Sequence, residues 1–359
     1  MKITRWITAL ALALSLACNS KPATTPSTET NDSSATTSPQ TLNLYTWADY
    51  IKPELVERFE KENNCKVVID TFDSNEAMFA KISSGATGYD VIVPSSYMVQ
   101  VMARQNLLMD LDHSKIPNLS NVDRDYLKIA FDKDMKFSAP YMLSYTGIGY
   151  LASKVGEVEP SWNLFADSRF NARCTLLNDM RETIGAGLKF NGFSLNSTDE
   201  NELAKARDTV IGWKKNIAKF ENEQYKNGIA SGEFVLVHGY SGDILQVQEE
   251  NEDIVFVLPK EGYSIACDDL VVPKSAKNPE LAFAFINFIH DPDVAAENTE
   301  YISYLCPNAS SYTKLSAEIL ANPGIFPSPE VRAVGEVLND LGDEIVKYNK
   351  IWDEIKAAQ

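Results

Sequence analysis

Acidic and aromatic side chains recur at positions where the sequence predicts that β-strands end. Trp47 and Tyr50 follow a strand predicted over residues 42–46, and Tyr97 follows an apolar strand predicted over 89–94. In open α/β sheets, residues directly beyond the strands face the ligand crevice. The candidates for lining such a crevice are Trp47, Tyr50, Ser95, Tyr97, Asp179, Glu182, Tyr240, Asp243, Asp268 and Tyr304.

This combination of side chains suits a small, flexible organic cation such as a linear polyamine. Carboxylates accept charge-assisted hydrogen bonds from ammonium groups, and aromatic faces cover methylene chains and attract cationic nitrogens. Each residue alone also has a structural interpretation, since an Asp after a strand is commonly a helix N-cap and a Tyr or Trp there commonly packs at a core edge. Recurrence at several strand ends favours a ligand site. We assign Asp49 to the start of the following helix instead.

Signatures of enzymes, cofactors and metals are missing from the sequence. It has no phosphate-binding or dinucleotide-binding glycine motif, and its three histidines, His113, His238 and His290, do not show zinc-site spacing. Residues 239–243, Gly-Tyr-Ser-Gly-Asp, differ from the G-x-S-x-G nucleophile motif at the final position. We therefore expect no enzymatic activity, no cofactor and no metal.

The composition points to an acidic protein of two ordinary domains. The chain has 359 residues, 44% of them hydrophobic, and a formal net charge of −17, which opposes nucleic-acid binding. An acidic surface is compatible with a cationic ligand, and it also serves solubility. The spacing of Cys65, Cys174, Cys267 and Cys306 allows three pairings and shows no disulfide framework, so we expect single buried thiols.

The N-terminus is typical of an exported protein. Lys2 and Arg5 precede an apolar run over residues 6–17, which is shorter than the roughly 20 residues of a membrane-spanning helix and ends at Cys18. We interpret residues 1–18 as a lipoprotein-type signal peptide with Cys18 as the acylated residue; cleavage near residue 17 without acylation is the alternative. Residues 19–40, rich in Ser, Thr and Pro, predict a flexible tether to a body that begins at residue 41.

Strands and helices alternate at the start of this body, which indicates a parallel sheet with crossover helices. The predicted strands are 42–46, 65–70 and 89–94, and the predicted helices are 53–61 and 74–82. Further along, the sequence predicts extended segments at 137–143 and 146–150, helices beginning at 161 and 180, a helix over 199–220, strands at 175–179, 232–237, 254–259 and 264–273, a helix from 278 and a helical tail over 329–356.

Four short segments in order resemble the spermidine/putrescine-binding periplasmic proteins of ABC importers. They are residues 44–50 (Leu-Tyr-Thr-Trp-Ala-Asp-Tyr), 89–97 (Tyr-Asp-Val-Ile-Val-Pro-Ser-Ser-Tyr), 259–262 (Pro-Lys-Glu-Gly) with the following Asp268, and 307–309 (Pro-Asn-Ala). The resemblance covers residues 41–356. It implies a two-lobe periplasmic-binding-protein fold of the type II kind, in which each lobe has a mixed, mainly parallel sheet flanked by helices. The ligand cleft would lie between lobe 1 (41–140 plus 267–312) and lobe 2 (141–266 plus 313–359).

The resemblance also implies individual roles. Asp179 and Glu182 would hold one amine end, Asp268 would bind an ammonium, and Tyr240 falls where the family has a Trp. Three further positions depart from the family's pattern. The family often has Trp where this chain has Ala266 and Gln where it has Leu338, and some relatives have Thr where it has Ala48. These departures leave open which polyamine is bound.

The sequence thus leads to a substrate-binding lipoprotein of a polyamine importer. It would be a monomer in the periplasm that binds spermidine and/or putrescine, contacts the permease, and touches the membrane only through its lipid. Two alternatives remain: the same fold binding another cationic or amino-acid-like solute, and an exported enzyme, adhesin or polyamine sensor that does not transport.

Overall fold

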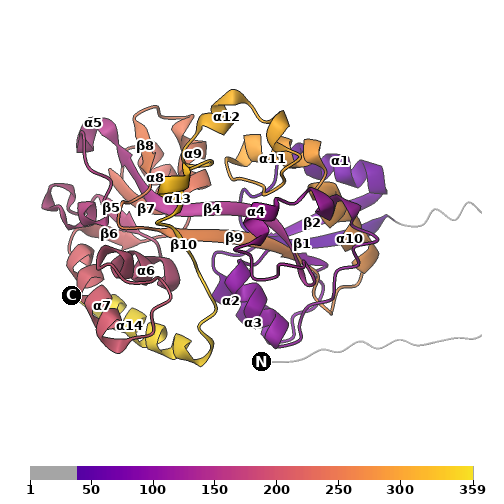
Figure 1. Ribbon diagram of the computed structural model, residues 1–359, viewed down its shortest axis with the longest axis horizontal. Helices are drawn as coiled ribbons and strands as arrows, with labels where there is room; N and C mark the ends of the chain where they lie inside the picture. Colours follow the sequence, from indigo (N-terminus) through magenta and orange to yellow (C-terminus); the bar gives the residue numbers. More distant parts are fainter. Residues whose placement is uncertain (1–38, 359) are drawn as a thin grey trace, which may run out of the picture. The chain divides into compact units, whose positions relative to one another are not determined.

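Two long antiparallel strands, β4 (Ser138–Leu151) and β9 (Ser264–Val271), run side by side through the middle of a single mixed sheet (Figure 1). The computed structural model describes residues 39–358; residues 1–38, with the predicted signal peptide, Cys18 and most of the tether, lie outside this range. The strand order is β2-β1-β3-β9-β4-β7-β5-β6, with β10 beside β9 and β8 beside β4. The remaining strands are β1 (Gln40–Thr46), β2 (Cys65–Thr71), β3 (Val91–Ile92), β5 (Cys174–Leu176), β6 (Ile217–Phe220), β7 (Leu236–Tyr240), β8 (Ile254–Val257) and β10 (Glu336–Val337).

Parallel pairing holds at both ends of this sheet, and antiparallel pairing holds along its centre except where the short β10 pairs parallel with β9. β1 is parallel to β2 and β3, and β5 is parallel to β6 and β7, whereas β9 and β4 pair antiparallel with each other and with β3 and β7 respectively. The strand–helix–strand order at each end explains the parallel pairs, because parallel neighbours need a crossover connection.

Helices cover the sheet, and their ends follow ordinary capping chemistry. α1 begins with Pro53, which suits the first turn, and ends at Asn64 with a left-handed backbone. Asp179 caps α6 by accepting the backbone N–H groups of Arg181 and Glu182. The helices are α1 (Pro53–Asn63), α2 (Asn75–Ser83), α3 (Ser96–Arg104), α4 (Arg124–Leu127), α5 (Ala152–Val155), α6 (Met180–Phe190), α7 (Glu200–Lys214), α8 (Gln224–Ala230), α9 (Ser241–Gln248), α10 (Pro279–Ile289), α11 (Pro292–Ile302), α12 (Ala317–Ala321), α13 (Pro329–Arg332) and α14 (Ile345–Ala357).

Separate hydrophobic cores lie at the two ends of the sheet, as the predicted two-lobe α/β fold requires. One core contains Phe59 and Phe285 and packs beneath α1 and α10; the other contains Trp162 and Trp213 and packs beneath α6 and α7. A smaller buried cluster around Met98 belongs to α2 and α3. β4 and β9 contribute side chains to both large cores and so join the lobes. No helix in residues 39–358 is long and apolar enough to cross a bilayer.

Two of the predicted elements are wrong. The helix predicted over 199–220 ends at Lys214, because residues 217–220 pair with β5 as the edge strand β6. The predicted helical tail over 329–356 contains two helices separated by β10, which pairs with β9 at Ser264 and Ile265. In both cases a strand partner distant in the sequence overrides the local helical pattern.

The histidines and cysteines take structural positions in the described chain. The four cysteines Cys65, Cys174, Cys267 and Cys306 are buried and unpaired, as predicted. His238 on β7 is fully buried, with its ring edge-on to Trp162 at 4.8 Å, and neither ring nitrogen has a hydrogen-bond partner in residues 39–358. Burial lowers the pKa of His238 to about 3, because an apolar surrounding disfavours the charged imidazolium.

Candidate ligand-binding cavity

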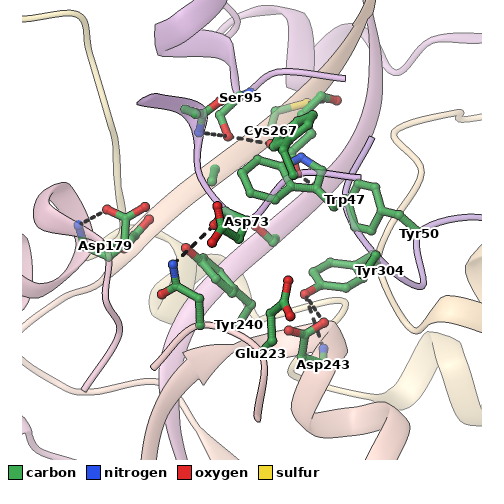
Figure 2. A pocket seen from close by; sticks show the side chains of 18 of the residues that line it. Trp47, Tyr50, Asp73, Ser95, Asp179, Glu223, Tyr240, Asp243, Cys267 and Tyr304 are labelled. Carbon is green, nitrogen blue, oxygen red and sulfur yellow. Dashed lines mark hydrogen bonds between the residues drawn. The ribbon is translucent and has the colours of Figure 1, made fainter. Parts of the chain in front are cut away.

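A cavity of about 290 Å³ opens where β1, β3, β5 and β7 end and where β9 passes beside them. The structure places in its wall all ten residues proposed from the sequence: Trp47, Tyr50, Ser95, Tyr97, Asp179, Glu182, Tyr240, Asp243, Asp268 and Tyr304. Figure 2 shows acidic and aromatic side chains from these separate elements arranged around one space. The end-of-strand rule accounts for Trp47, Ser95 and Tyr240, whereas Asp268 lies within β9 and Tyr304 follows helix α11 rather than a strand.

Asp268 is held at the sheet by two short hydrogen bonds. The hydroxyls of Tyr50 and Ser95 donate to its Oδ2 and Oδ1, each at 2.6 Å, and the amide of Asn75 donates to Ser95 Oγ at 3.0 Å. Burial raises the pKa of Asp268 to about 6, and the two hydroxyls partly offset that rise. The carboxyl is thus held in one position, and no cationic side chain in residues 39–358 forms an ion pair with it.

Glu182 is the second buried acid in the wall. Its Oε2 accepts from Thr146 Oγ1 at 2.8 Å and its Oε1 accepts from Ser264 Oγ at 2.7 Å. Burial raises the pKa of Glu182 to about 8, with repulsion from neighbouring Asp179 adding to the rise. Because Asp179 caps α6 and Glu182 lies in the first turn, one helix end carries both acids toward the cavity.

Aromatic rings form the apolar part of the wall. Tyr50 and Tyr304 meet edge to face at 5.3 Å, and Trp47 meets Phe72 at 4.4 Å. Gly242 permits the position of Tyr304, because a Cβ on Gly242 would lie 2.2 Å from the Tyr304 ring. Trp47 Nε1 is buried and has no hydrogen-bond acceptor within the described residues.

At another part of the wall, Asp243 carries a network of its own. It accepts hydrogen bonds from the hydroxyls of Tyr225 at 2.6 Å and Tyr304 at 2.9 Å. Lys226 Nζ lies 3.9 Å from Asp243 Oδ1 and 3.2 Å from Asp49 Oδ2. The sequence had suggested that Asp49 belongs to the start of the following helix, and this assignment is wrong. Asp49 lies ahead of α1, whose N-cap is Lys52, and has a left-handed backbone with φ of 52°.

Two further carboxylates in the wall were missed from the sequence. Asp73 follows β2 and Glu223 follows β6, each just before a helix. The same end-of-strand rule applies to Asp73. Glu223 was hidden because the sequence predicted a helix through residue 220 rather than the strand β6. Figure 2 shows Glu223 beside Asp243 and Asp73 above Tyr240.

The three positions that depart from the family pattern, Ala48, Ala266 and Leu338, all line this cavity. Each presents a small or apolar group where an aromatic ring, an amide or a hydroxyl was expected from the resemblance. By contrast, Ser241 of the Gly-Tyr-Ser-Gly-Asp segment is buried, and its Oγ accepts the backbone N–H of Tyr145 at 3.3 Å. No group of three metal-ligating side chains occurs within residues 39–358.

Comparisons with known proteins agree with each other. Residues 54–327 match the model of the family described as bacterial extracellular solute-binding protein. The chain is 34% identical over 334 residues to the putrescine/cadaverine-binding protein of Pseudomonas aeruginosa, and this alignment covers 89% of this chain and 94% of that protein. Two solved structures, each 34% identical over 88% of this chain, are similar in fold. They are a lipoprotein of Treponema pallidum (TM-score 0.79, 99% of that chain) and the spermidine/putrescine ABC transporter substrate-binding protein of Streptococcus pneumoniae (TM-score 0.77, 98% of that chain).

Proposed function

The chain belongs to the family of bacterial extracellular solute-binding proteins, and on that premise we propose that it captures polyamines, spermidine and/or putrescine, for an ABC importer. One observation carries the proposal: Asp179, Glu182 and Asp268 face the same cavity as the aromatic rings, and none of the three forms an ion pair within residues 39–358. Among the cavity-lining residues of the described chain, ion pairs occur only where Lys226 meets Asp49 and Asp243. Ligand ammonium groups would supply the charge that these acids lack.

The proposed ligand set can be tested by thermal unfolding. Putrescine, cadaverine, spermidine or spermine at a hundred times its dissociation constant is expected to add about 2.7 kcal/mol to the stability of the folded state. Arginine and ornithine serve as the amino-acid-like alternatives, which the small groups at Ala48 and Ala266 could accommodate. A rise in melting temperature with an amino acid and none with any polyamine would replace the polyamine assignment with the second candidate.

Polyamine binding at neutral pH is expected to release a proton. With a pKa of about 8, Glu182 is mostly protonated at pH 7 in the empty cavity, and a nearby ammonium favours its charged form. Titration calorimetry in phosphate and in Tris, which differ in ionisation enthalpy, should therefore show release of up to about one proton at pH 7, decreasing as the pH rises through about 8. Glu182→Gln should show much less release. Equal enthalpies in the two buffers for the unmodified protein would contradict the assignment.

The cellular setting is part of the same proposal. The relative in Treponema pallidum is named a lipoprotein, and residues 1–18 with Cys18 carry the pattern of a lipid-anchored precursor. We propose a monomer on the outer side of the cytoplasmic membrane, tethered through residues 19–40, that delivers its ligand to the permease. Radiolabelled fatty acid incorporated into the wild-type protein and not into Cys18→Ser would support the anchor.

We further propose that residues 41–140 with 267–312 move as one lobe and 141–266 with 313–359 as the other. The two hydrophobic cores divide close to these bounds: on β4 the change falls between Met142, in the core of the first lobe, and Leu143, in the core of the second, two residues beyond the proposed boundary. Domain closure would then bury a ligand between them.

A further inference from the structure

Lys226 brings a cation into an otherwise acidic cavity. Its side chain, on α8, is only 16% exposed, and Nζ lies 3.2 Å from Asp49 and 3.9 Å from Asp243. Within the described chain it is the one Lys or Arg of the cavity wall, against seven acids: Asp49, Asp73, Asp179, Glu182, Glu223, Asp243 and Asp268. Most of the negative charge of the wall therefore remains unbalanced.

The lysine side chain has the chemistry of one end of a polyamine. Four methylenes followed by an ammonium make an aminobutyl group, which is also present in putrescine and in one arm of spermidine. Asp243 is oriented by the hydroxyls of Tyr225 and Tyr304, and the Lys226 ammonium, hydrogen-bonded to Asp49, lies within ion-pairing distance of it at 3.9 Å. The part of the wall around Asp243 thus already contains an ammonium group, which the rest of the described wall lacks.

The position of Asp243 separates this pair from the other acids. In the view of Figure 2, Asp179 and Asp243 lie on opposite sides of Tyr240. Asp268 lies on β9 and is bonded by Tyr50 and Ser95 instead. A ligand ammonium can thus reach Asp179 or Asp268 without meeting Lys226, whereas an ammonium at Asp243 would lie against a like charge.

We propose that Lys226 is a built-in ammonium that occupies the Asp243 end of the cavity and sets the ligand's charge, so that the site favours diamines over triamines and tetramines. This inference rests on the proposed polyamine binding and makes it more specific. The residue also joins the two lobes, because Asp49 follows β1 of one core and Tyr225, next to Lys226, is buried in the other. Loss of that contact would affect all ligands alike, whereas the choice among ligands depends on the charge at Asp243.

The test is the ratio of two dissociation constants, spermidine over putrescine, measured by calorimetry at one pH and one salt concentration. Lys226→Met keeps the aliphatic stem and removes the charge, and it is expected to lower this ratio at least tenfold. Lys226→Gln provides a second uncharged variant should Met impair folding. Lys66→Met is the matched control: Lys66 is exposed, pairs with Glu60 away from the cavity, and its loss changes the net charge equally.

The outcomes distinguish failure of the role given to Lys226 from failure of the proposed polyamine binding. A lowered ratio in Lys226→Met, an unchanged ratio in Lys66→Met and restoration of the ratio in Lys226→Met/Asp243→Asn would support the inference. An unchanged ratio in both Lys226 variants, with polyamine binding intact, would overturn the inference and leave the proposed function standing. Absence of polyamine binding by the unmodified protein would overturn both.

Discussion

Replacing Asp268 by alanine is expected to weaken binding of putrescine and spermidine by about 2–5 kcal/mol, the range for removing one partner of a buried charge pair. Asp268 is 8% exposed, and hydrogen bonds from Tyr50 and Ser95 fix its carboxyl. Its charge is therefore buried at one defined position in the wall, and the alanine variant leaves a bound ammonium without that partner. Titration calorimetry measures the loss. Asp268→Asn, which keeps the size and can still accept one of the two hydroxyls, should lose most of the same free energy, because the ammonium needs the negative charge.

The matched control lies one residue further along the same strand. Asp269 is equally buried and bonds to Ser96 but does not line the cavity. Burial raises the pKa of Asp269 to about 8, so replacement by Asn leaves a similar neutral group at pH 7. We expect Asp269→Asn to keep its polyamine affinity. Unchanged binding in Asp268→Ala, or an equal loss in Asp269→Asn, would reject the role given to Asp268.

Acid is expected to destabilise the protein through His238. The folded state keeps this imidazole neutral down to a pKa of about 3, whereas the unfolded chain takes up a proton near pH 6.5. Between those values the unfolded state binds more protons, so this contribution is complete above pH 6.5 and is lost as the pH falls. The free energy of unfolding should decrease by about 3 kcal/mol from this group alone between pH 6.5 and pH 4.

Urea denaturation of the unmodified protein and of His238→Leu at pH 7 and pH 4 isolates this effect. Leucine cannot be protonated and can pack against Trp162, so the variant should lose less stability on acidification by that amount. His113→Leu is the control, since His113 is exposed. Parallel pH profiles for His238→Leu and the unmodified protein would show that His238 does not carry the acid sensitivity.

The sequence identified the wall of the cavity better than it identified some of the elements around it. Strand ends such as those before Trp47 and Ser95 are marked by local apolar runs, and the α/β architecture then brings them to one edge. Strand β6 depends on its pairing with β5, and no local pattern records that partner. The same applies to Lys226, whose partner Asp49 is 177 residues away.

The hydrogen-bond partners of the acids in the cavity could not be predicted from the sequence either. The pattern indicated that Glu182 and Asp268 face a cavity, but not that hydroxyls from Thr146, Ser264, Tyr50 and Ser95 would hold them. Those donors lie on β4 and β9 and in the segments after β1 and β3, and they partly offset the rise that burial causes in the pKa of each acid.

Strand β4 is irregular at the place where the sheet passes from one hydrophobic core to the other. The register with β9 shifts between Pro140 and Met142, and Met142 then pairs with Asp268. The boundary between the two cores falls at the same place, since Met142 packs in one and Leu143 in the other. β4 and β9 run continuously through this boundary, so a change in the angle between the proposed lobes would bend the sheet beside Asp268. A ligand bound at that carboxyl, as proposed, would lie directly beside the strands that must bend when the lobes close.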